Sequence, residues 1–265
     1  MLKNIRIVMV GTSHPGNIGA AARGMKAMGL EQLYLVAPKV FPHAEVTARA
    51  AGADDLIAKA QVVEHIEASL LGCRLVLGCS ARGRFLSLPV LNPSQCAEKS
   101  LEVASQAPVA ILFGNEQHGL SNAELQHCHF QVCIPSNPEF SSLNVAAAIQ
   151  IIAYELSQNA RANPSPIRPF EPPSPARGEG SVSISRAQKQ KMKIASPQDL
   201  PATAEDMALF YAHLEQTLIA IHFLDPSNPR KLMQRLHRFF NRAQPETLEL
   251  NILRGILTAV LQKKS

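Results

Sequence analysis

The chain has 265 residues, of which 46% are hydrophobic, 18% are charged and 5% are aromatic, and this composition indicates a folded protein rather than a disordered one. No apolar run approaches the roughly 18 residues of a membrane helix and the N-terminal segment has no signal-peptide pattern, so we expect a cytoplasmic protein without membrane contact. The net charge is +5, and five cysteines without a CxxC pair predict reduced thiols and no metal centre.

Short apolar runs with few charges predict a parallel β-sheet. The five runs cover residues 5–11, 33–38, 74–80, 109–114 and 130–135. Helical patterns lie between and after them, at 17–28, 94–106, 121–128 and about 142–159. Because strands and helices alternate strictly in this prediction, we expect an α/β fold with helices on both faces of the sheet. Such sheets bind ligands outside the carboxyl ends of their strands, so the following loops are the places to search.

The end of the chain differs from the rest in composition. Residues 160–202 are rich in proline and then in lysine and arginine, which predicts a flexible linker. Residues 203–265 predict three short helices, the first of which starts at Thr203 with Asp206 three positions later. We therefore expect a domain over 1–159, the linker, and a small all-helical C-terminal unit.

The positive charge is concentrated in the last third of the chain. Residues 1–158 carry a net charge of −1, whereas residues 159–265 carry +6. One predicted helix places Arg235, Arg238 and Arg242 on a single face. Such a face is usually just solvated, and a basic tail also aids solubility, but the +6 excess favours contact with the phosphates of a polyanion.

The first and third predicted strands are followed by loops suited to a polar or anionic ligand. In GTSHPGNIGAAAR, Gly16 and Asn17 open a helix that places Arg23 about two turns in, where an arginine exposed to solvent is an equally good interpretation. This loop lacks GxGxxG, which counts against a dinucleotide site. In CSARGRF, Arg82 and Arg84 either contact an anion or are solvated.

The fourth and fifth strands are followed by two more unusual loops. In FGNEQHGLSN, Gly114 and Gly119 bracket Glu116, and such glycines either let the backbone approach a flat ligand or make a turn. In IPSNPEFSSLN, polar residues gather where the next helix must begin, although one side-chain cap is enough. The surplus residues are Ser141, Ser142 and Asn144. Free backbone N–H groups and the positive end of the helix dipole lie at the same place, which suits a ligand.

Taken together in this order, SHPGNIGAAAR, SARGR, FGNEQHGLSN and NPEFSSLNVAAA resemble the motifs of the SPOUT superfamily of S-adenosylmethionine-dependent RNA methyltransferases, and most closely its TrmJ group. The likeness covers residues 4–158 and extends more loosely to the C-terminal helices. It implies a parallel-sheet SPOUT fold with a C-terminal trefoil knot and a homodimer. It also implies 2′-O-methylation of a cytidine or uridine at position 32 in the anticodon loop of tRNA.

Carried over to this chain, the resemblance implies a cofactor site, a reaction site and RNA contacts. The cofactor-binding residues are Cys79, Ser80, Ala81, Gly114, Glu116, Gly119, Ile134, Ser142 and Leu143. The catalytic residues are Asn17, Arg23, Glu116, Ser142 and Asn144. The RNA-binding residues are Arg23, Arg82, Arg84, Arg235 and Arg238. Asn17 and Arg23 are expected to come from the partner subunit.

The proposed chemistry depends on positioning rather than on a metal. Methyl transfer from a sulfonium leaves a neutral sulfur, so the difficulty is the weak acidity of the ribose hydroxyl. Arg23 is a poor base because a guanidinium stays protonated at neutral pH. We expect Arg23 to orient the 2′-oxygen and to neutralise a neighbouring phosphate, while Ser142 and Asn144 hydrogen-bond the nucleophile. The proton acceptor is left unassigned.

Three positions depart from the pattern of the family. Relatives often carry Glu, Thr and Arg where this chain has Gly11, Cys79 and Asn115. One RNA or cofactor contact is therefore moved or missing. The catalytic arginine, serine and asparagine are retained, so activity is still expected.

Three other functions stay open at this point. They are a SPOUT methyltransferase acting on ribosomal RNA, a non-catalytic RNA-binding SPOUT protein, and a nucleotide-dependent oxidoreductase. The helical C-terminal unit favours tRNA over ribosomal RNA, the retained Arg23, Ser142 and Asn144 count against a non-catalytic protein, and the missing GxGxxG counts against an oxidoreductase. His127 and His129 in HCHFQVC precede a buried strand, and their spacing favours ordinary structure over a metal site.

Overall fold

The core of the molecule is one parallel β-sheet. The structure is a computed structural model that describes residues 1–80, 88–140, 142–162 and 200–263. The strands are β1 (Ile5–Val10), β2 (Gln32–Val36), β3 (Gln61–Val63), β4 (Leu75–Cys79), β5 (Val90–Leu91), β6 (Val109–Phe113) and β7 (Phe130–Val132). Their order is β3-β2-β1-β6-β4-β7-β5, and every pair is parallel. The parallel α/β fold predicted from the sequence is confirmed.

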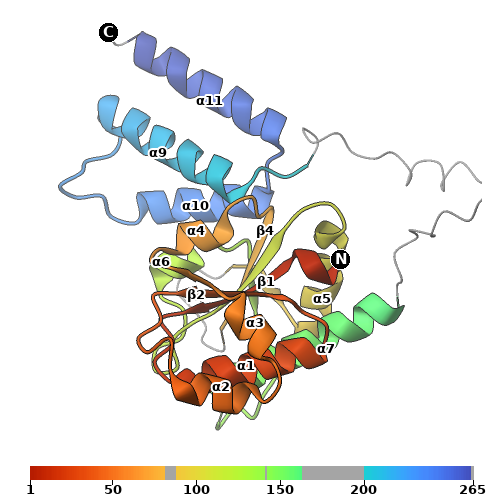
Figure 1. Cartoon of the computed structure of the whole chain (residues 1–265). Coiled ribbons are helices and arrows are strands. Elements are labelled where there is room, and N and C mark those ends of the chain that lie inside the picture. Colours follow the sequence, from red (N-terminus) through yellow and green to blue (C-terminus); the bar gives the residue numbers. More distant parts are fainter. Residues whose placement is uncertain (81–87, 141, 163–199, 264–265) are drawn as a thin grey trace, which may run out of the picture.

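Helices cover both faces of this sheet (Figure 1). Those of the core are the 3-10 helix η1 (Leu2–Asn4) and the α-helices α1 (Pro15–Ala27), α2 (Ala44–Ala50), α3 (Asp54–Ala58), α4 (Ile66–Leu70), α5 (Pro93–Ala104), α6 (Asn122–Leu125) and α7 (Val145–Ala162). The four helices expected from the sequence are present. The strict alternation was wrong, because α2 and α3 both lie between β2 and β3.

The strands are apolar on both sides because each side of the sheet faces a separate core. Ile7 and Met9 of β1 pack in the core beneath α1, α5 and α7. Val8 and Val10 of the same strand pack in the second core, together with Leu70 of α4. Alternate residues of a strand point to opposite faces, so a doubly covered strand needs an unbroken apolar run. This requirement explains why the sequence marks the central strands so clearly.

The C-terminal residues form a helical unit with its own small core. Its helices are α9 (Ala204–Ala220), α10 (Leu232–Ala243) and α11 (Thr247–Gln262). Phe210 of α9 packs edge-on against Phe240 of α10 at 4.8 Å between ring centres, and Leu250 of α11 closes the cluster. The helix start expected at Thr203 is confirmed, because its side chain and that of Asp206 cap α9 reciprocally.

This helical unit docks on the second core instead of standing apart. The backbone N–H of Ala204 donates to the carbonyl oxygen of Cys73 at 2.8 Å, and the Arg74 guanidinium donates to the carbonyl oxygen of Pro201. Figure 1 shows α11 farthest from the sheet. The predicted linker falls mostly on residues 163–199, which lie outside the described residues, whereas residues 160–162 complete α7.

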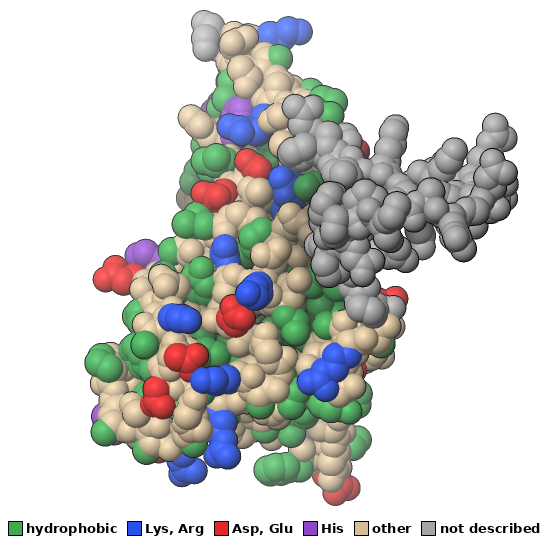
Figure 2. Space-filling model, turned by 45° about the vertical axis from the view of Figure 1, so that its right-hand side comes forward, with side chains coloured by type: hydrophobic (Ala, Val, Ile, Leu, Met, Phe, Trp, Pro, Cys, Tyr) green, Lys and Arg blue, Asp and Glu red, His purple; other side chains and the backbone are tan. Residues whose placement is uncertain are grey.

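Two surface properties bear on the partners of the protein. Within the described ranges, no helix is both long and apolar enough to cross a membrane. On the face seen in Figure 2, lysine and arginine side chains are scattered among aspartate and glutamate and form no continuous patch over the core. This distribution agrees with the near-neutral charge of residues 1–158.

Candidate functional site

A pocket of about 1000 Å³ lies at the carboxyl ends of three strands. In the sheet register Cys79, the last residue of β4, stands beside Phe113 of β6 and Val132 of β7, so the loops that follow these strands converge. The predicted residues that line the pocket are Cys79, Ser80, Gly114, Glu116, Gly119, Ile134, Ser142, Leu143 and Asn144. Ala81 lies outside the described residues. The structure thus gathers residues that are up to 65 positions apart in the sequence.

The loop after β6 needs glycine because its backbone folds onto itself. A Cβ atom added to Gly114 would lie 2.1 Å from the carbonyl carbon of Gly119 and 2.2 Å from the backbone nitrogen of Leu120. The N–H of Gly119 donates to the carbonyl oxygen of Asn115 at 2.8 Å, and Gly119 has a φ of +65°, which favours glycine. The two glycines predicted from the sequence therefore build a tight turn that forms one wall of the pocket.

Glu116 connects this loop to the start of α1. One carboxylate oxygen accepts hydrogen bonds from the backbone N–H of Ser13 at 3.0 Å and from its hydroxyl at 2.8 Å. The other oxygen accepts from the amide of Asn17 at 2.9 Å. Partial burial alone would raise the pKa of Glu116, but the bonds from Ser13 and Asn17 more than offset it and lower the pKa to about 2. Glu116 is therefore ionised at neutral pH and is a poor proton acceptor.

Asn144 joins the start of α7 to the same network. Its side-chain oxygen accepts from the backbone N–H of Ala146 at 2.9 Å and so caps the helix, while its nitrogen donates to the side-chain oxygen of Asn17 at 2.9 Å. The expected helix start near Ser142 is thus corrected to Val145. Asn144 is sufficient as the cap, so Ser142 is not needed for this role. Ser142 is exposed and lines the pocket. Ser141 lies outside the described residues.

The two residues expected from a partner subunit behave differently. Asn17, which was expected from the partner, bonds to Glu116 and Asn144 of its own chain. Arg23 is exposed on α1, and it does not line the pocket of its own chain. The structure therefore assembles the asparagine and glutamate of the predicted reaction site within one chain, but leaves the arginine outside it.

Two contacts at the site were not predicted from the sequence. Ser13 was part of the quoted SHPGN motif, yet its hydrogen bonds to Glu116 span 103 positions and no local pattern signals them. Asn115 donates to the carbonyl oxygen of Gly11 at 2.7 Å. Two of the three departures from the family pattern are therefore direct neighbours.

The cysteine and histidine residues near the site have structural roles. Burial, with Cys96 and Cys133 nearby, raises the pKa of Cys79 to about 12, so this thiol is neutral and unreactive at pH 7. His129 is buried, and its Nδ1 accepts from the backbone N–H of Val76 at 3.0 Å. The predicted preference for ordinary structure over a metal site at His129 agrees with this bond.

The remaining predicted RNA-binding residues lie away from the pocket. Arg82 and Arg84 fall outside the described residues. Arg238 of α10 lines a cleft against α6, and Arg235 borders a hollow beside the connection from α9 to α10. The structure does not bring these two arginines to the pocket at the strand ends.

The hydrogen bonds of Glu116 predict a specific pH dependence of stability. Its pKa is about 2 in the folded protein, against 4.5 for an ordinary glutamate, so its stabilisation is complete above pH 4.5 and is lost as the pH falls toward 2. We expect Glu116→Gln to lower the thermal midpoint at pH 7, with the difference from the unaltered protein shrinking between about pH 4.5 and 2. Glu139→Gln, at an exposed side chain, is the matched control. A difference that stayed constant with pH would contradict an ionised anchor.

Comparison with known proteins gives family matches over both parts of the chain. The model of the SpoU rRNA Methylase family matches residues 4–154, and that of the tRNA methyltransferase TrmJ C-terminal domain matches residues 205–265. A tRNA (cytidine/uridine/adenosine-2′-O-)-methyltransferase TrmJ of Pseudomonas aeruginosa is 48% identical over 97% of this chain and 94% of its own length. A tRNA (cytidine/uridine-2′-O-)-methyltransferase TrmJ of Klebsiella pneumoniae is 46% identical over 99% of this chain and 98% of its own length.

Solved structures agree with these matches. TrmJ from Z. mobilis superposes with a TM-score of 0.76 and 28% identity, covering 96% of this chain and 98% of that one. A probable methylase family protein from Haemophilus influenzae gives a TM-score of 0.58 with 38% identity, covering 99% and 98%. Both the sheet domain and the C-terminal helices therefore have counterparts in single chains of similar length.

Proposed function

This chain belongs to the SpoU methylase family, in its TrmJ group, and we propose that it transfers the methyl group of S-adenosylmethionine to a ribose 2′-hydroxyl of tRNA. The observation that carries the proposal is the network of Ser13, Glu116, Asn17 and Asn144 at the pocket, because it lies at the motifs that identify the family. The C-terminal match favours tRNA over ribosomal RNA. A cytidine or uridine at position 32 of the anticodon loop is the proposed target.

The pocket fits S-adenosylmethionine in size and chemistry. Its volume of about 1000 Å³ stands at the upper end of the ~300–1,000 Å³ typical of small-molecule sites. Ile134 and Leu143 offer apolar surface for a nucleoside base, and the loops at Ser80 and Gly119 offer backbone polar groups. The bound cofactor supplies an electrophilic methyl group on a sulfonium, whose departure leaves a neutral thioether. The leaving group therefore carries no negative charge that would need a cation to stabilise it.

Within the chain, Glu116 acts as an anchor and not as the base. Its ionised carboxylate holds Asn17, and Asn17 in turn holds Asn144, so the starts of α1 and α7 are fixed relative to each other. This arrangement positions Ser142 at the pocket, where its hydroxyl can hydrogen-bond the ribose oxygen. Glu116 is a poor acceptor for the released proton because its pKa is about 2.

We propose that Arg23 serves the pocket of the second subunit in a homodimer. The support is its exposed position on α1, outside the pocket of its own chain. A guanidinium there would orient the 2′-oxygen and neutralise a neighbouring phosphate. We further propose the trefoil knot implied by the SPOUT resemblance, and a cytoplasmic location, which suits five free cysteines.

Methyl transfer to RNA tests the proposed function directly. Purified protein with labelled S-adenosylmethionine is expected to methylate tRNA, and not ribosomal RNA fragments, in the presence of EDTA. Nucleoside mass spectrometry should then find the label on a ribose of the anticodon loop. Loss of transfer with EDTA and its recovery with a divalent ion would contradict a metal-free mechanism, provided that melting curves show the tRNA folded in both buffers. Binding of tRNA without transfer would support a non-catalytic protein.

A further inference from the structure

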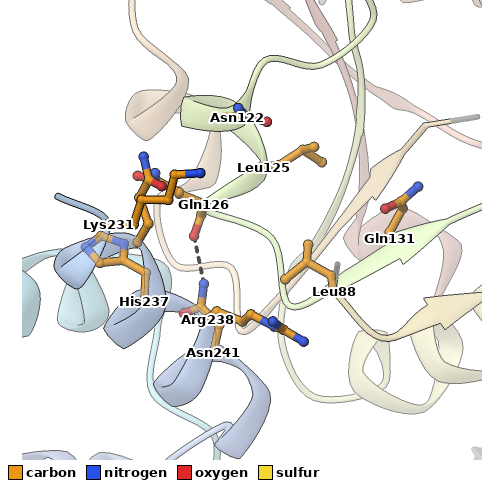
Figure 3. Close-up of a pocket in the computed structure, with 10 residues that line it drawn as sticks. Leu88, Asn122, Leu125, Gln126, Gln131, Lys231, His237, Arg238 and Asn241 are labelled. Carbon is orange, nitrogen blue, oxygen red and sulfur yellow. Dashed lines mark hydrogen bonds between the residues drawn. The ribbon is translucent and has the colours of Figure 1, made fainter. Parts of the chain in front are cut away.

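A cleft of about 770 Å³, including its open mouth, separates α6 of the core from α10 of the C-terminal unit. We call it the α6–α10 cleft. Figure 3 shows Lys231, His237 and Arg238 on the α10 side, facing Leu88 and Leu125 on the core side. The cleft is distinct from the pocket at the strand ends, and the two share no lining residue.

The α10 wall of this cleft is firmly attached to the core. Asn241 is buried, and its side-chain nitrogen donates to the carbonyl oxygens of Gln126 at 2.7 Å and Cys128 at 3.3 Å. The Tyr211 hydroxyl donates to the side-chain oxygen of Asn241 at 2.7 Å, and the Tyr211 ring stacks on His237 at 3.7 Å. Both polar atoms of the Asn241 side chain are therefore bonded, and these bonds attach α10 to the segment after α6.

The histidine of this wall is uncharged at neutral pH. Burial, together with the nearby His127, lowers the pKa of His237 to about 4. The ring therefore adds no positive charge at pH 7, and it is already stacked on Tyr211. Among the described residues that line the cleft, the cationic side chains are those of Arg238 and Lys231.

The segment that contributes these cations contains no acid. Between Pro226 and Pro245 there are five lysines and arginines and neither an aspartate nor a glutamate. Within the described ranges, Arg238 has no ion-pair partner. An unneutralised guanidinium beside an apolar surface favours an anionic ligand that also has an apolar part.

The opposite wall distinguishes between anionic ligands. Leu88 and Leu125 are nearly buried and form an apolar floor, while Asn122 and Gln126 of this wall and Gln234 of α10 contribute amide groups around it. Amides both donate and accept hydrogen bonds, as the edge of a nucleobase requires. An acidic peptide would use the cations but would have no need for this combination.

We propose that the α6–α10 cleft binds one unpaired nucleotide of the tRNA, with its phosphate beside Arg238 and Lys231 and its base over Leu88 and Leu125. The inference rests on the proposed tRNA substrate. Single-stranded loops offer such splayed bases, whereas paired regions do not. Because the cleft has one wall from each part of the chain, it also explains why the helical unit docks on the core.

The cleft lies close enough to the pocket to help orient the substrate. Gln131 lines the cleft, and its side-chain nitrogen donates to the carbonyl oxygen of Ser80, which lines the pocket. A nucleotide held in the cleft would thus place the neighbouring RNA near the reaction site. Binding in the cleft is therefore expected to affect both tRNA affinity and methyl transfer.

Arg238→Gln in the full chain tests the proposal, with Gln126→Ala as a second variant. Gln126 anchors Asn241 through its backbone oxygen, so loss of its side chain leaves the attachment of α10 intact. We expect Arg238→Gln to weaken tRNA binding about tenfold and to reduce its salt dependence. Arg254→Gln on α11 removes the same charge from an equally half-buried site outside the cleft, and should have a clearly smaller effect.

Photocrosslinking identifies the occupant. The unaltered protein, irradiated with tRNA that contains 4-thiouridine, should be labelled within residues 122–131 or 231–241. Equal tRNA binding by the Arg238 and Arg254 variants, or crosslinks only in other segments, would refute nucleotide binding in the cleft. The proposed function would still hold in that case if the unaltered protein transfers the methyl group. Competition by polyglutamate as strong as that by an RNA oligonucleotide of equal charge would assign the cleft to acidic peptides instead. Absence of methyl transfer in the unaltered protein would refute the proposed function separately.

Discussion

Gly114→Ala is expected to abolish binding of S-adenosylmethionine. The added methyl group would stand 2.1 Å from the Gly119 carbonyl carbon, and backbone atoms cannot move aside as a flexible side chain can. The turn must open, and Glu116 and Gly119 then leave their places in the pocket wall. We expect at least about 100-fold weaker binding, or about 2.7 kcal/mol, which is within the usual cost of overpacking. Isothermal titration calorimetry measures this directly.

The control for this substitution is Gly255→Ala. Gly255 lies within α11, where an added Cβ meets no atom within 4 Å, so the change should leave cofactor binding unaltered and should stabilise the helix slightly. Circular dichroism shows whether the Gly114 variant is still folded. A folded Gly114→Ala protein with normal cofactor affinity would show that the turn is not a necessary wall of the cofactor site.

Arg23→Ala is expected to lower methyl transfer by a factor of about 100 or more while cofactor affinity stays nearly unchanged. The physical reason is that Arg23 is exposed and does not line the pocket of its own chain, so its loss does not disturb the cofactor contacts. Single-turnover transfer and cofactor titration separate the two effects. Arg49→Ala, which removes an exposed arginine from α2, is the matched control.

Mixed dimers test whether Arg23 serves the other subunit. A dimer that combines one Arg23→Ala chain with one Ser142→Ala chain has one pocket with both groups intact if sites are shared. Such dimers should recover part of the activity that neither variant shows alone. If verified mixed dimers stayed inactive, Arg23 would act on its own chain or only on distant RNA.

The sequence predicted the central strands well and the edges of the sheet poorly. Strands such as β1 and β6 are buried on both faces and therefore appear as unbroken apolar runs. The missed strands β3 and β5 lie at the two edges of the sheet, have three and two residues, and contain no buried residue, whereas the predicted β7, also of three residues, is mostly buried. Helices α2, α3 and α4 were also missed, and they have seven, five and five residues.

The candidate site was predicted as a set of residues but not as a network. Glu116 and Asn144, which the motifs singled out, both line the pocket, because glycine, asparagine and serine stand out in loops after strands. Their hydrogen bonds to Asn17 span 99 and 127 positions, and single-sequence patterns carry no such information. The docking of α10 on the core could not be predicted either, because in the sequence Asn241 resembles any polar residue on a helix surface.

The strand order also constrains how the chain folds during synthesis. Strand β1 lies between β2 and β6, and Ile5 pairs with Val109. A nascent chain that has not reached β6 can pair β1 with β2 only, so the other edge of β1 stays open. Because β1 is synthesised long before β6, its unpaired edge is exposed during translation, and a chaperone or a second nascent chain would bind there. Synonymous codon substitutions that slow translation between β2 and β6 are therefore expected to reduce the yield of native protein without altering any residue of the finished site.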